Sequence, residues 1–395
     1  MTNLPSTRIT KTVMLFIFSI CFNFLAQGQG FEGYYQSPAL YNNTIVFAAE
    51  GDLWTVPLSG GLANRLTTHA EEERFPTISP DGKTIAYSAS YEGPTEIYTM
   101  PIKGGLPTRW TFEGDASIAT TWTPDGKLVY ATRAYSKVPD NQIVTIDLES
   151  KKKHRIPLSQ ASESTFDQSG NTMYFVRPAF HRNVTKRYKG GTARQIWKFT
   201  QGEQEAIKLT NDYIGESHHP NWFSGRIYFI SDRDGIMNIW SMDESGKDLQ
   251  QHTTHNNFDV RSMSISNGQI VYQIGADLWL YTIDSKQNHK IDITLASDLD
   301  QLREKWDDNP AKYITAVHPD PEGNSIVITA RGRIFVAPVK SGRFISFTEK
   351  KQVRFRDAVF SSNGSKIYAL SDETGEFEFV SIPADGIGKE STITK

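Results

Sequence analysis

The sequence predicts an all-β protein: a six-bladed β-propeller followed by the first two blades of a second propeller. Three observations support this fold class. A turn motif recurs along the chain, an apolar strand follows each turn, and a short run ending in threonine closes most of the repeats. A period near 40–45 residues with short, turn-marked strands is typical of propeller blades, each of which is a four-stranded sheet.

The turn motif is clearest at 79–83, where Ser-Pro-Asp-Gly-Lys stands between two alternating apolar runs. Proline presets the φ angle of a turn and glycine accepts the positive φ that closes it, so this segment predicts a β-hairpin. The motif returns at 123–127 and in weaker forms elsewhere. The aligned turn positions are Asn43, Gly82, Gly126, Gly170, Gly225, Gly268, Gly323 and Gly364.

An apolar run follows each turn and is predicted to form the third strand of its blade. The eight runs lie at 52–58, 96–102, 142–148, 195–201, 238–244, 277–283, 333–339 and 378–384. A shorter fourth strand ends in threonine in five repeats, at 65–67, 109–111, 208–210, 251–254 and 346–348. Four strands per repeat is the number that a blade requires. The eighth repeat is predicted to stop after its third strand.

Two intervals between turns are longer than the rest. Between Gly170 and Gly225 the extra residues, 177–197, predict an enlarged loop inside a blade. Between Gly268 and Gly323 the extra residues follow a complete blade. We therefore expect a six-bladed propeller at 31–295, a helical connector at 296–312 and the start of a second, truncated propeller at 313–395.

The connector is expected to contain a short helix. Ser297 or Asp298 can cap it, and Asn309-Pro310 can end it. Its apolar side would contain Leu299, Leu302 and Trp306. The first blade has all four strands locally, starting near Gln36. We therefore expect the six-bladed ring to close through side-chain contacts alone, without a strand shared between its ends.

The first 28 residues predict a cleaved signal peptide. Arg8 and Lys11 precede an apolar run at 13–25, and small residues stand at Ala26 and Gly28. The run is shorter than the roughly 20 residues of a membrane-spanning helix, so we expect export rather than anchoring. Cys21 is the only cysteine and lies in this segment. The mature protein would therefore contain no disulfide, no thiol nucleophile and no cysteine metal site.

Composition and motifs exclude several function classes. The net charge of −3 argues against binding to nucleic acid or to an anionic membrane. The sequence has no nucleophile elbow, zinc-protease helix, phosphate loop or dinucleotide fingerprint, so we predict no catalytic residue and no cofactor in this chain. Asp232, Asp234 and Gly235 resemble the start of a calcium loop, but the later acidic ligand is missing, and we interpret the segment as a turn.

Four histidines, His69, His218, His219 and His255, are predicted to lie in connections between one blade's fourth strand and the next blade's first strand. The same Thr-Thr-His run occurs at 67–69 and 253–255, which is typical of an inherited repeat position. We therefore predict no metal site.

The enlarged loop is the strongest candidate for binding. Residues 179–202 contain six basic side chains and no acidic one. The candidate substrate-binding residues are Arg187, Lys189 and Arg194, which could clamp a peptide carboxylate. The alternatives are a solvated hairpin and an arm that docks on a neighbouring domain.

The runs at 187–197, 225–253 and 303–315 give the chain its family resemblance. They make it similar to the N-terminal half of a tricorn-type protease, while the Ser-Pro-Asp-Gly-Lys repeat is shared with TolB-like propellers. The resemblance implies a six-bladed and then a seven-bladed propeller, a PDZ-like module and a serine peptidase domain in a homo-hexamer. The catalytic positions of the family would lie beyond Lys395. The basic pair that holds a peptide's C-terminus in archaeal relatives has no counterpart at 114–122.

The resemblance implies that the parent protein hydrolyses peptides. This segment would guide or filter peptides or unfolded polypeptide and would not itself be catalytic. Together with the export signal, the resemblance predicts a periplasmic protein. The alternatives are a stand-alone TolB-like binding propeller and the propeller cap of a prolyl-oligopeptidase-like enzyme.

Overall fold

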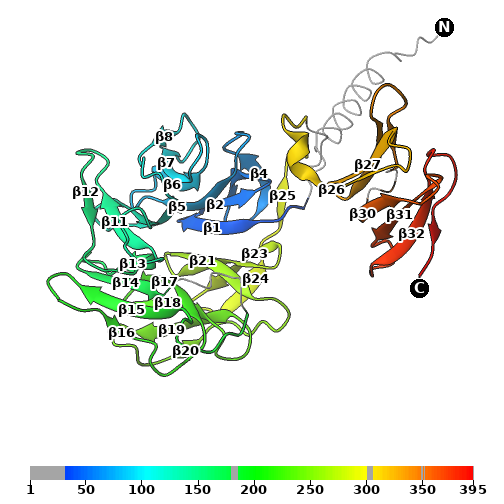
Figure 1. Ribbon diagram of the computed structural model, residues 1–395. Helices are drawn as coiled ribbons and strands as arrows, with labels where there is room; N and C mark the ends of the chain where they lie inside the picture. Colours follow the sequence, from blue (N-terminus) through cyan, green and yellow to red (C-terminus); the bar gives the residue numbers. More distant parts are fainter. Residues whose placement is uncertain (1–31, 179–185, 300–305, 348–349, 351, 395) are drawn as a thin grey trace, which may run out of the picture. The chain divides into compact units, whose positions relative to one another are not determined.

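Figure 1 shows a computed structural model of the chain, which describes residues 32–178, 186–299, 306–347, 350 and 352–394. The regular structure in these residues is almost entirely β-sheet, and the predicted all-β class is confirmed. The chain divides into two compact units, Met1–Leu302 and Arg303–Lys395. Each unit is described by itself.

The described part of the first unit contains six sheets, each containing four consecutive strands, and the first sheet also has a fifth strand from the end of the unit. The first two sheets comprise β1 (Gln36–Tyr41), β2 (Thr44–Ala49), β3 (Asp52–Pro57) and β4 (Gly61–Arg65), then β5 (Glu73–Ile78), β6 (Thr84–Ala89), β7 (Glu96–Pro101) and β8 (Thr108–Arg109). The next two comprise β9 (Ser117–Trp122), β10 (Leu128–Thr132), β11 (Gln142–Ile146) and β12 (Lys153–Arg155), then β13 (Ser162–Phe166), β14 (Thr172–Arg177), β15 (Gln195–Thr200) and β16 (Ile207–Lys208). The last two comprise β17 (Ser217–Phe223), β18 (Arg226–Ser231), β19 (Asn238–Asp243) and β20 (Gln250–Gln251), then β21 (Val260–Ser266), β22 (Gln269–Ile274), β23 (Asp277–Thr282) and β24 (Gln287–Lys290).

The turn motif forms the hairpins that the sequence predicts. Gly82 has φ +70°, and a side chain there would collide with the ring of Tyr41. The hydroxyl of Ser79 donates to the Asp81 carboxylate at 2.6 Å, and the Gly82 N–H donates to the Ser79 carbonyl at 2.8 Å. Glycine adopts a positive φ without the steric strain that a Cβ atom causes, so the motif determines where the hairpin turns.

The first strands of the six sheets contact one another in a closed cycle. β1, β5, β9, β13, β17 and β21 each touch the next, and β21 touches β1. Each is also the terminal strand of its own sheet. The first strands therefore lie at the centre of a ring of sheets, and the fourth strands lie at its outside.

The core lies between neighbouring sheets. Val46 and Leu53 of the first sheet pack with Ile85 and Tyr98 of the second, for example, and all four are buried. Each sheet has two apolar faces, and burying both needs a neighbour on each side. The ring of sheets satisfies this requirement.

The fourth strands end two residues before the threonines with which the sequence predicted them to end, and these threonines have a structural role. The hydroxyls of Thr67, Thr111, Thr210 and Thr253 accept the N–H groups of third-strand residues Leu53, Ile97, Ile196 and Ile239, at 2.8, 2.8, 3.1 and 2.9 Å. All four threonines are buried. Each one ties the end of the short outer strand to the strand beside it, which explains why the sequence repeats threonine at this position.

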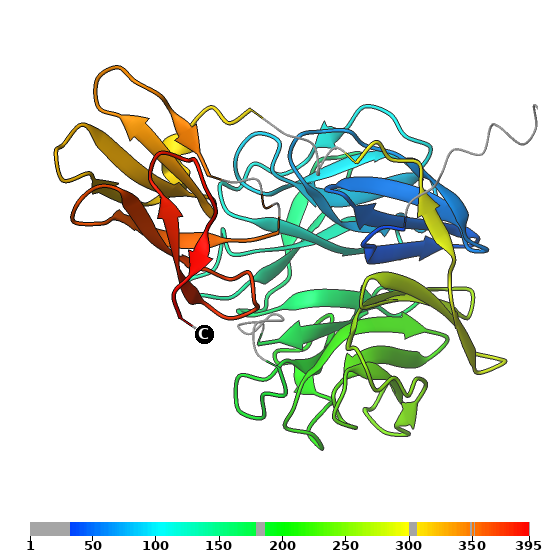
Figure 2. The ribbon, with the colours of Figure 1, turned by 90° about the vertical axis from the view of Figure 1, so that its right-hand side faces the viewer.

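The prediction that the ring closes by side-chain contacts alone is wrong. After β24 the chain returns to the first sheet, and β25 (Ile293–Leu295) pairs in parallel with β4 as its fifth strand (Figures 1 and 2). The Gly61 N–H donates to the Asp292 carbonyl at 2.8 Å, and the Tyr35 hydroxyl donates to the Ile293 carbonyl at 2.7 Å. Backbone hydrogen bonds thus join the two ends of the ring.

The connector differs from its prediction where it is described. Asn309 precedes a 3₁₀ turn, η2 (Pro310–Tyr313), so Asn309-Pro310 begins a helical turn instead of ending a helix. Leu299 has φ +56°, which is not helical, and Trp306 is 94% exposed. The rest of the predicted helix lies outside the described residues. No helix in the described ranges is long and apolar enough to cross a membrane.

The described part of the second unit contains two further four-stranded sheets. They comprise β26 (Ile314–Pro319), β27 (Ser325–Ala330), β28 (Arg333–Pro338) and β29 (Ile345–Ser346), then β30 (Phe355–Phe360), β31 (Lys366–Ser371), β32 (Glu378–Pro383) and β33 (Ser391–Thr392). The prediction that the eighth repeat stops after its third strand is wrong, because β33 pairs with β32. Its Ser-Thr pair carries no apolar residue, so the sequence pattern does not reveal it.

Candidate functional site

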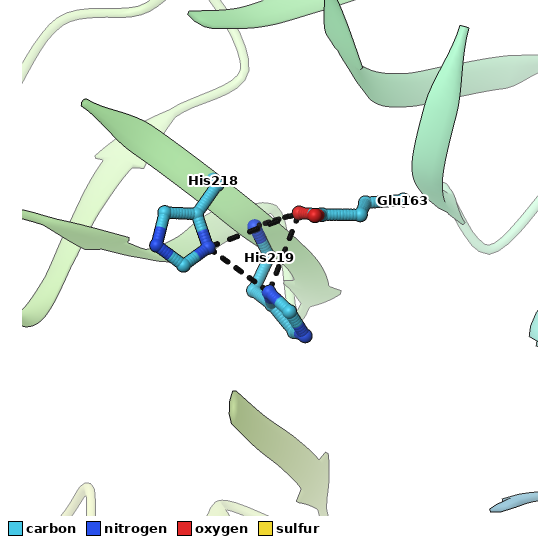
Figure 3. Close-up of side chains that lie close together, drawn as sticks. All are labelled: Glu163, His218 and His219. Atoms are coloured by element: carbon cyan, nitrogen blue, oxygen red, sulfur yellow. Dashed lines mark hydrogen bonds and ion pairs between the residues drawn. The ribbon is translucent and has the colours of Figure 1, made fainter. Parts of the chain in front are cut away.

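Two neighbouring first strands bring three potential ligand side chains together near the centre of the ring. Glu163 lies on β13, and His218 and His219 lie on β17 (Figure 3). The Nδ1 atoms of the two histidines are 3.0 Å apart. Oε2 of Glu163 lies 3.3 Å from Nδ1 of His219 and 3.8 Å from Nδ1 of His218.

A β-bulge explains how two consecutive residues of a strand meet the same partner. Successive side chains of a regular strand point to opposite faces. His219 has φ +52°, however, and the pairing of β17 with β18 shifts register between His218 and Asn221. Glu163 has φ +40° at a matching shift in β13. Bulges redirect side chains in this way, and here they turn three polar groups toward one point.

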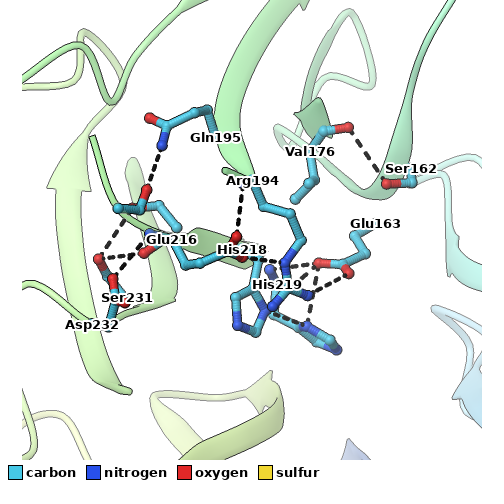
Figure 4. Close-up of polar contacts among 12 residues, drawn as sticks. Ser162, Glu163, Val176, Arg194, Gln195, Glu216, His218, His219, Ser231 and Asp232 are labelled. Carbon is cyan, nitrogen blue, oxygen red and sulfur yellow. Dashed lines mark hydrogen bonds and ion pairs between the residues drawn. The ribbon is translucent and has the colours of Figure 1, made fainter. Parts of the chain in front are cut away.

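Buried ion pairs hold the cluster in place (Figure 4). Arg194 precedes β15, and its Nε donates to Oε2 of Glu216 at 2.5 Å. Its backbone N–H donates to Oε1 of the same residue at 3.2 Å, and its Nη1 lies 3.5 Å from Oε1 of Glu163. Oε2 of Glu163 also accepts the backbone N–H of His219 at 2.9 Å. Glu163 is thus fixed by the His219 N–H of β17 and by Arg194, which directly precedes β15.

The charges of the cluster follow from this environment. Burial opposes ionisation of Glu163, but His219, Arg194 and His218 outweigh it and hold the pKa of this carboxyl well below its usual value. Burial, reinforced by the charge of Arg194, lowers the pKa of His218 well below its usual value. At neutral pH the cluster therefore contains a carboxylate and an uncharged imidazole, which are the ligand forms that metal ions bind.

Comparison with known proteins identifies the propeller. Residues 32–287 match the family described as the tricorn protease N-terminal beta propeller domain. The chain belongs to this family. Tricorn protease homolog 1 of Streptomyces coelicolor is 27% identical over 371 residues, which cover 91% of this chain and 34% of the relative. The tricorn protease homolog of Saccharolobus solfataricus is 25% identical over 346 residues, which cover 87% of this chain and 32% of the relative.

A solved structure gives the same fold for this tricorn-family chain. The crystal structure of the tricorn protease superposes with a TM-score of 0.79 over 92% of this chain and 36% of that one, at 21% identity. The chain spans about a third of the length of the curated relatives described above. The resemblance predicted from the sequence is therefore confirmed for the propeller part.

The candidate binding residues of the enlarged loop have different environments in this tricorn propeller. Arg187 forms an ion pair with Asp259 at 2.9 Å, and Lys186 contacts the same carboxylate at 3.1 Å. Lys189 is exposed. Arg194 is buried, and its guanidinium is engaged by Glu216, so it does not belong to an exposed clamp. Residues 179–185 lie outside the described residues.

The histidines are only partly where the sequence placed them. His69 and His255 lie in connections between sheets, as predicted. His218 and His219 lie within β17, so the prediction of a connecting loop is wrong for this pair. Their strand begins earlier than expected because Ser217 and His218 already pair with β18. At the predicted turn, the Gly235 N–H donates to the Asp232 carbonyl at 2.9 Å, in agreement with that interpretation.

A second buried carboxylate, Glu73, leads to a prediction about pH. It accepts hydrogen bonds from Tyr91 at 2.6 Å and from Thr67 at 2.8 Å, and burial raises its pKa to about 7. Between pH 4.5 and 7 the folded protein holds a proton that the unfolded chain has released, so the stability contribution of Glu73 falls as pH rises through this window.

We expect Glu73→Gln to remove this pH dependence, which amounts to about 2–3 kcal/mol between pH 4.5 and 7.5. Urea unfolding of the wild type and the variant at a series of pH values measures it. Glu71→Gln, at an exposed neighbour, should leave the slope unchanged. Parallel slopes in the wild type and Glu73→Gln would show that Glu73 is ionised in the folded protein.

Proposed function

We propose that this chain is the propeller segment of an exported tricorn-like serine peptidase, and that it guides or filters peptides toward a catalytic domain outside these residues. The observation that carries the proposal is the family match over residues 32–287, in a chain that covers about a third of relatives named as proteases. Catalysis is accordingly assigned to the remaining part of a longer, oligomeric protein, for which a homo-hexamer is the proposed assembly.

The ring supports peptide handling through its central strands. Each first strand is the terminal strand of its sheet, so one backbone edge of each is not paired within that sheet. Extended peptides bind such edges through main-chain hydrogen bonds that do not depend on sequence. Some edge groups are already satisfied, since the Ala119 N–H donates to Ser88 and the Trp222 N–H donates to Thr165. The other edge groups would give a path that accepts many sequences.

Export is proposed from residues 1–28, which lie outside the described residues. The predicted cleavage after Gly28 would give a mature chain that starts at Gln29 and a periplasmic location. Determining the N-terminus of the protein from the host's periplasmic fraction tests this part. An N-terminus at Met1 in the membrane fraction would contradict it.

The exposed basic residues Arg187 and Lys189 are proposed to attract the carboxylate end of a peptide. We expect the double variant Arg187→Ala/Lys189→Ala to slow the cleavage of an unstructured fluorogenic peptide by the full reading-frame product several-fold. Its melting temperature should fall by no more than a few degrees. Lys152→Ala/Lys247→Ala removes two exposed charges elsewhere and is the matched control. Equal rates for both double variants would remove the loop from peptide handling.

The reading frame beyond Lys395 separates this proposal from its alternative. Further blades and a serine peptidase domain, with hydrolysis that a serine-reactive reagent abolishes, are the expected result. A stop codon directly after Lys395 would instead favour a stand-alone binding propeller.

A further inference from the structure

The central cluster has the donor set of a zinc-type site. Glu163, His218 and His219 offer one carboxylate oxygen and two imidazole nitrogens, and all three atoms lie within 4.8 Å of one another. A tetrahedral zinc ion about 2.0–2.2 Å from each ligand places neighbouring donor atoms roughly 3.3–3.5 Å apart. The observed separations of 3.0, 3.3 and 3.8 Å bracket this value. One ion can therefore meet all three atoms after shifts of a few tenths of an ångström.

The backbone prearranges these donors. The bulge at His219 places both Nδ1 atoms on one side of β17, and the His219 N–H holds Oε2 of Glu163 in front of them. Arg194 approaches the other oxygen of Glu163, Oε1, so it orients the carboxylate without covering the face toward the histidines. Groups that hydrogen-bond to a ligand side chain and hold it in position are typical of metal sites.

The local charge suits a cation. Among the described residues, Arg194 is the cationic side chain that forms an ion pair with Glu163, and Glu216 already neutralises it. The carboxylate of Glu163 is the anionic group that faces the two Nδ1 atoms. Nitrogen donors favour zinc and its transition-metal neighbours over calcium or magnesium, which prefer oxygen ligands.

The site is accessible from solvent. The side chain of His219 is 31% exposed and that of Glu163 is 20% exposed, whereas His218 is buried at 2%. Three protein ligands with one exposed side leave the fourth position of a tetrahedral ion for water or for an oxygen of a ligand. Because β13 and β17 belong to neighbouring sheets, a bound ion would also join two sheets at the centre of the ring.

We propose that Glu163, His218 and His219 bind a divalent transition metal ion of the zinc class, with an open fourth position at the centre of the propeller. The site does not depend on the proposed peptidase function. In the present geometry the two Nδ1 atoms are hydrogen-bonded to each other, so one of them carries a proton. When a metal ion binds both Nδ1 atoms, that proton moves to Nε2 of the same neutral ring, so the two imidazoles remain neutral ligands.

The test is calorimetric titration of the chelator-treated mature chain with Zn²⁺. We expect one ion bound per chain and a higher melting temperature with Zn²⁺ than without it. Mg²⁺ should bind much more weakly. Co²⁺ should give the visible absorption of a four-coordinate nitrogen–oxygen site.

Two ligand variants and a control make the test specific. Glu163→Gln and His219→Asn should each weaken Zn²⁺ binding by at least about 100-fold. Asparagine tolerates the positive φ at 219 but is too short to act as this ligand, so the bulge is kept. His154→Ala removes an exposed histidine elsewhere and should bind like the wild type. Circular dichroism verifies that each variant is folded.

Several results would overturn the proposal. They are a folded wild type that takes up no Zn²⁺ at micromolar concentration, equal affinity in the wild type and the folded ligand variants, and an equal loss of affinity in His154→Ala. The last two would place the ion elsewhere on the chain.

Discussion

Replacing Arg194 with alanine is expected to destabilise the propeller by about 3–5 kcal/mol, because removing one partner of a buried ion pair leaves the other charge buried and unpaired. Glu216 is 1% exposed and receives two hydrogen bonds from Arg194. In Arg194→Ala only the hydrogen bond from the backbone N–H would remain. Urea unfolding of the purified mature chain measures the loss.

Two further variants distinguish the ion pair from simple loss of packing. Arg194→Met/Glu216→Leu removes both charges and should recover much of the stability that Arg194→Ala loses. Arg187→Ala, at an ion pair whose arginine side chain is 38% exposed, should cost only about 1 kcal/mol. If Arg194→Ala cost as little as Arg187→Ala, Arg194 would be free to act as the peptide clamp that the sequence predicted.

The double variant Ile293→Ala/Leu295→Ala should weaken the closure of the ring, with a loss of about 4 kcal/mol or more, since each truncation of a buried aliphatic side chain costs roughly 2–5 kcal/mol. Both residues are buried in the cluster that also contains Tyr35 and Ala63. Without the packing of these two side chains, the pairing of β25 with β4 should be weaker. The Gly61 amide, which donates to Asp292, should then exchange with deuterium faster than in the wild type.

A matched control uses two exposed aliphatic residues of the same propeller. Leu106→Ala/Ile207→Ala deletes a similar number of carbon atoms from residues that are 91% and 55% exposed. We expect changes within about 0.5 kcal/mol per site and unchanged exchange at Gly61. If both double variants behaved alike, β25 would contribute little to closure, and the predicted closure by side-chain packing between sheets would be sufficient.

The parts of the fold that the sequence predicted correctly are those set by local chemistry. A glycine turn such as the one at Gly82 needs only its own neighbours, so the repeated motif located the hairpins and the strands around them. β25 escaped prediction because three residues outside the repeat carry no periodic signal. Its partner β4 lies more than two hundred residues away in the chain.

The candidate site depends on contacts between distant residues, and this limits what the sequence can reveal. In the sequence, no local pattern distinguishes Glu163 from the other residues of its polar strand. In the structure, β13 lies beside β17, and two bulges turn the side chains of Glu163 and His219 toward each other. Arg194 was grouped with a basic loop because no acidic residue lies near it in sequence. Its partner Glu216 follows 22 residues later, at the start of the next sheet. Because Arg194 is buried against Glu216, its positive charge stabilises the fold and is not available at the surface.

The most direct test of the central claim is to incubate the purified mature chain with a fluorescent, unstructured peptide and to follow anisotropy and peptide mass together. We expect the anisotropy to rise as the ring binds the peptide and the peptide mass to stay unchanged. Cleavage of the peptide by this chain, abolished by a serine-reactive reagent, would contradict it.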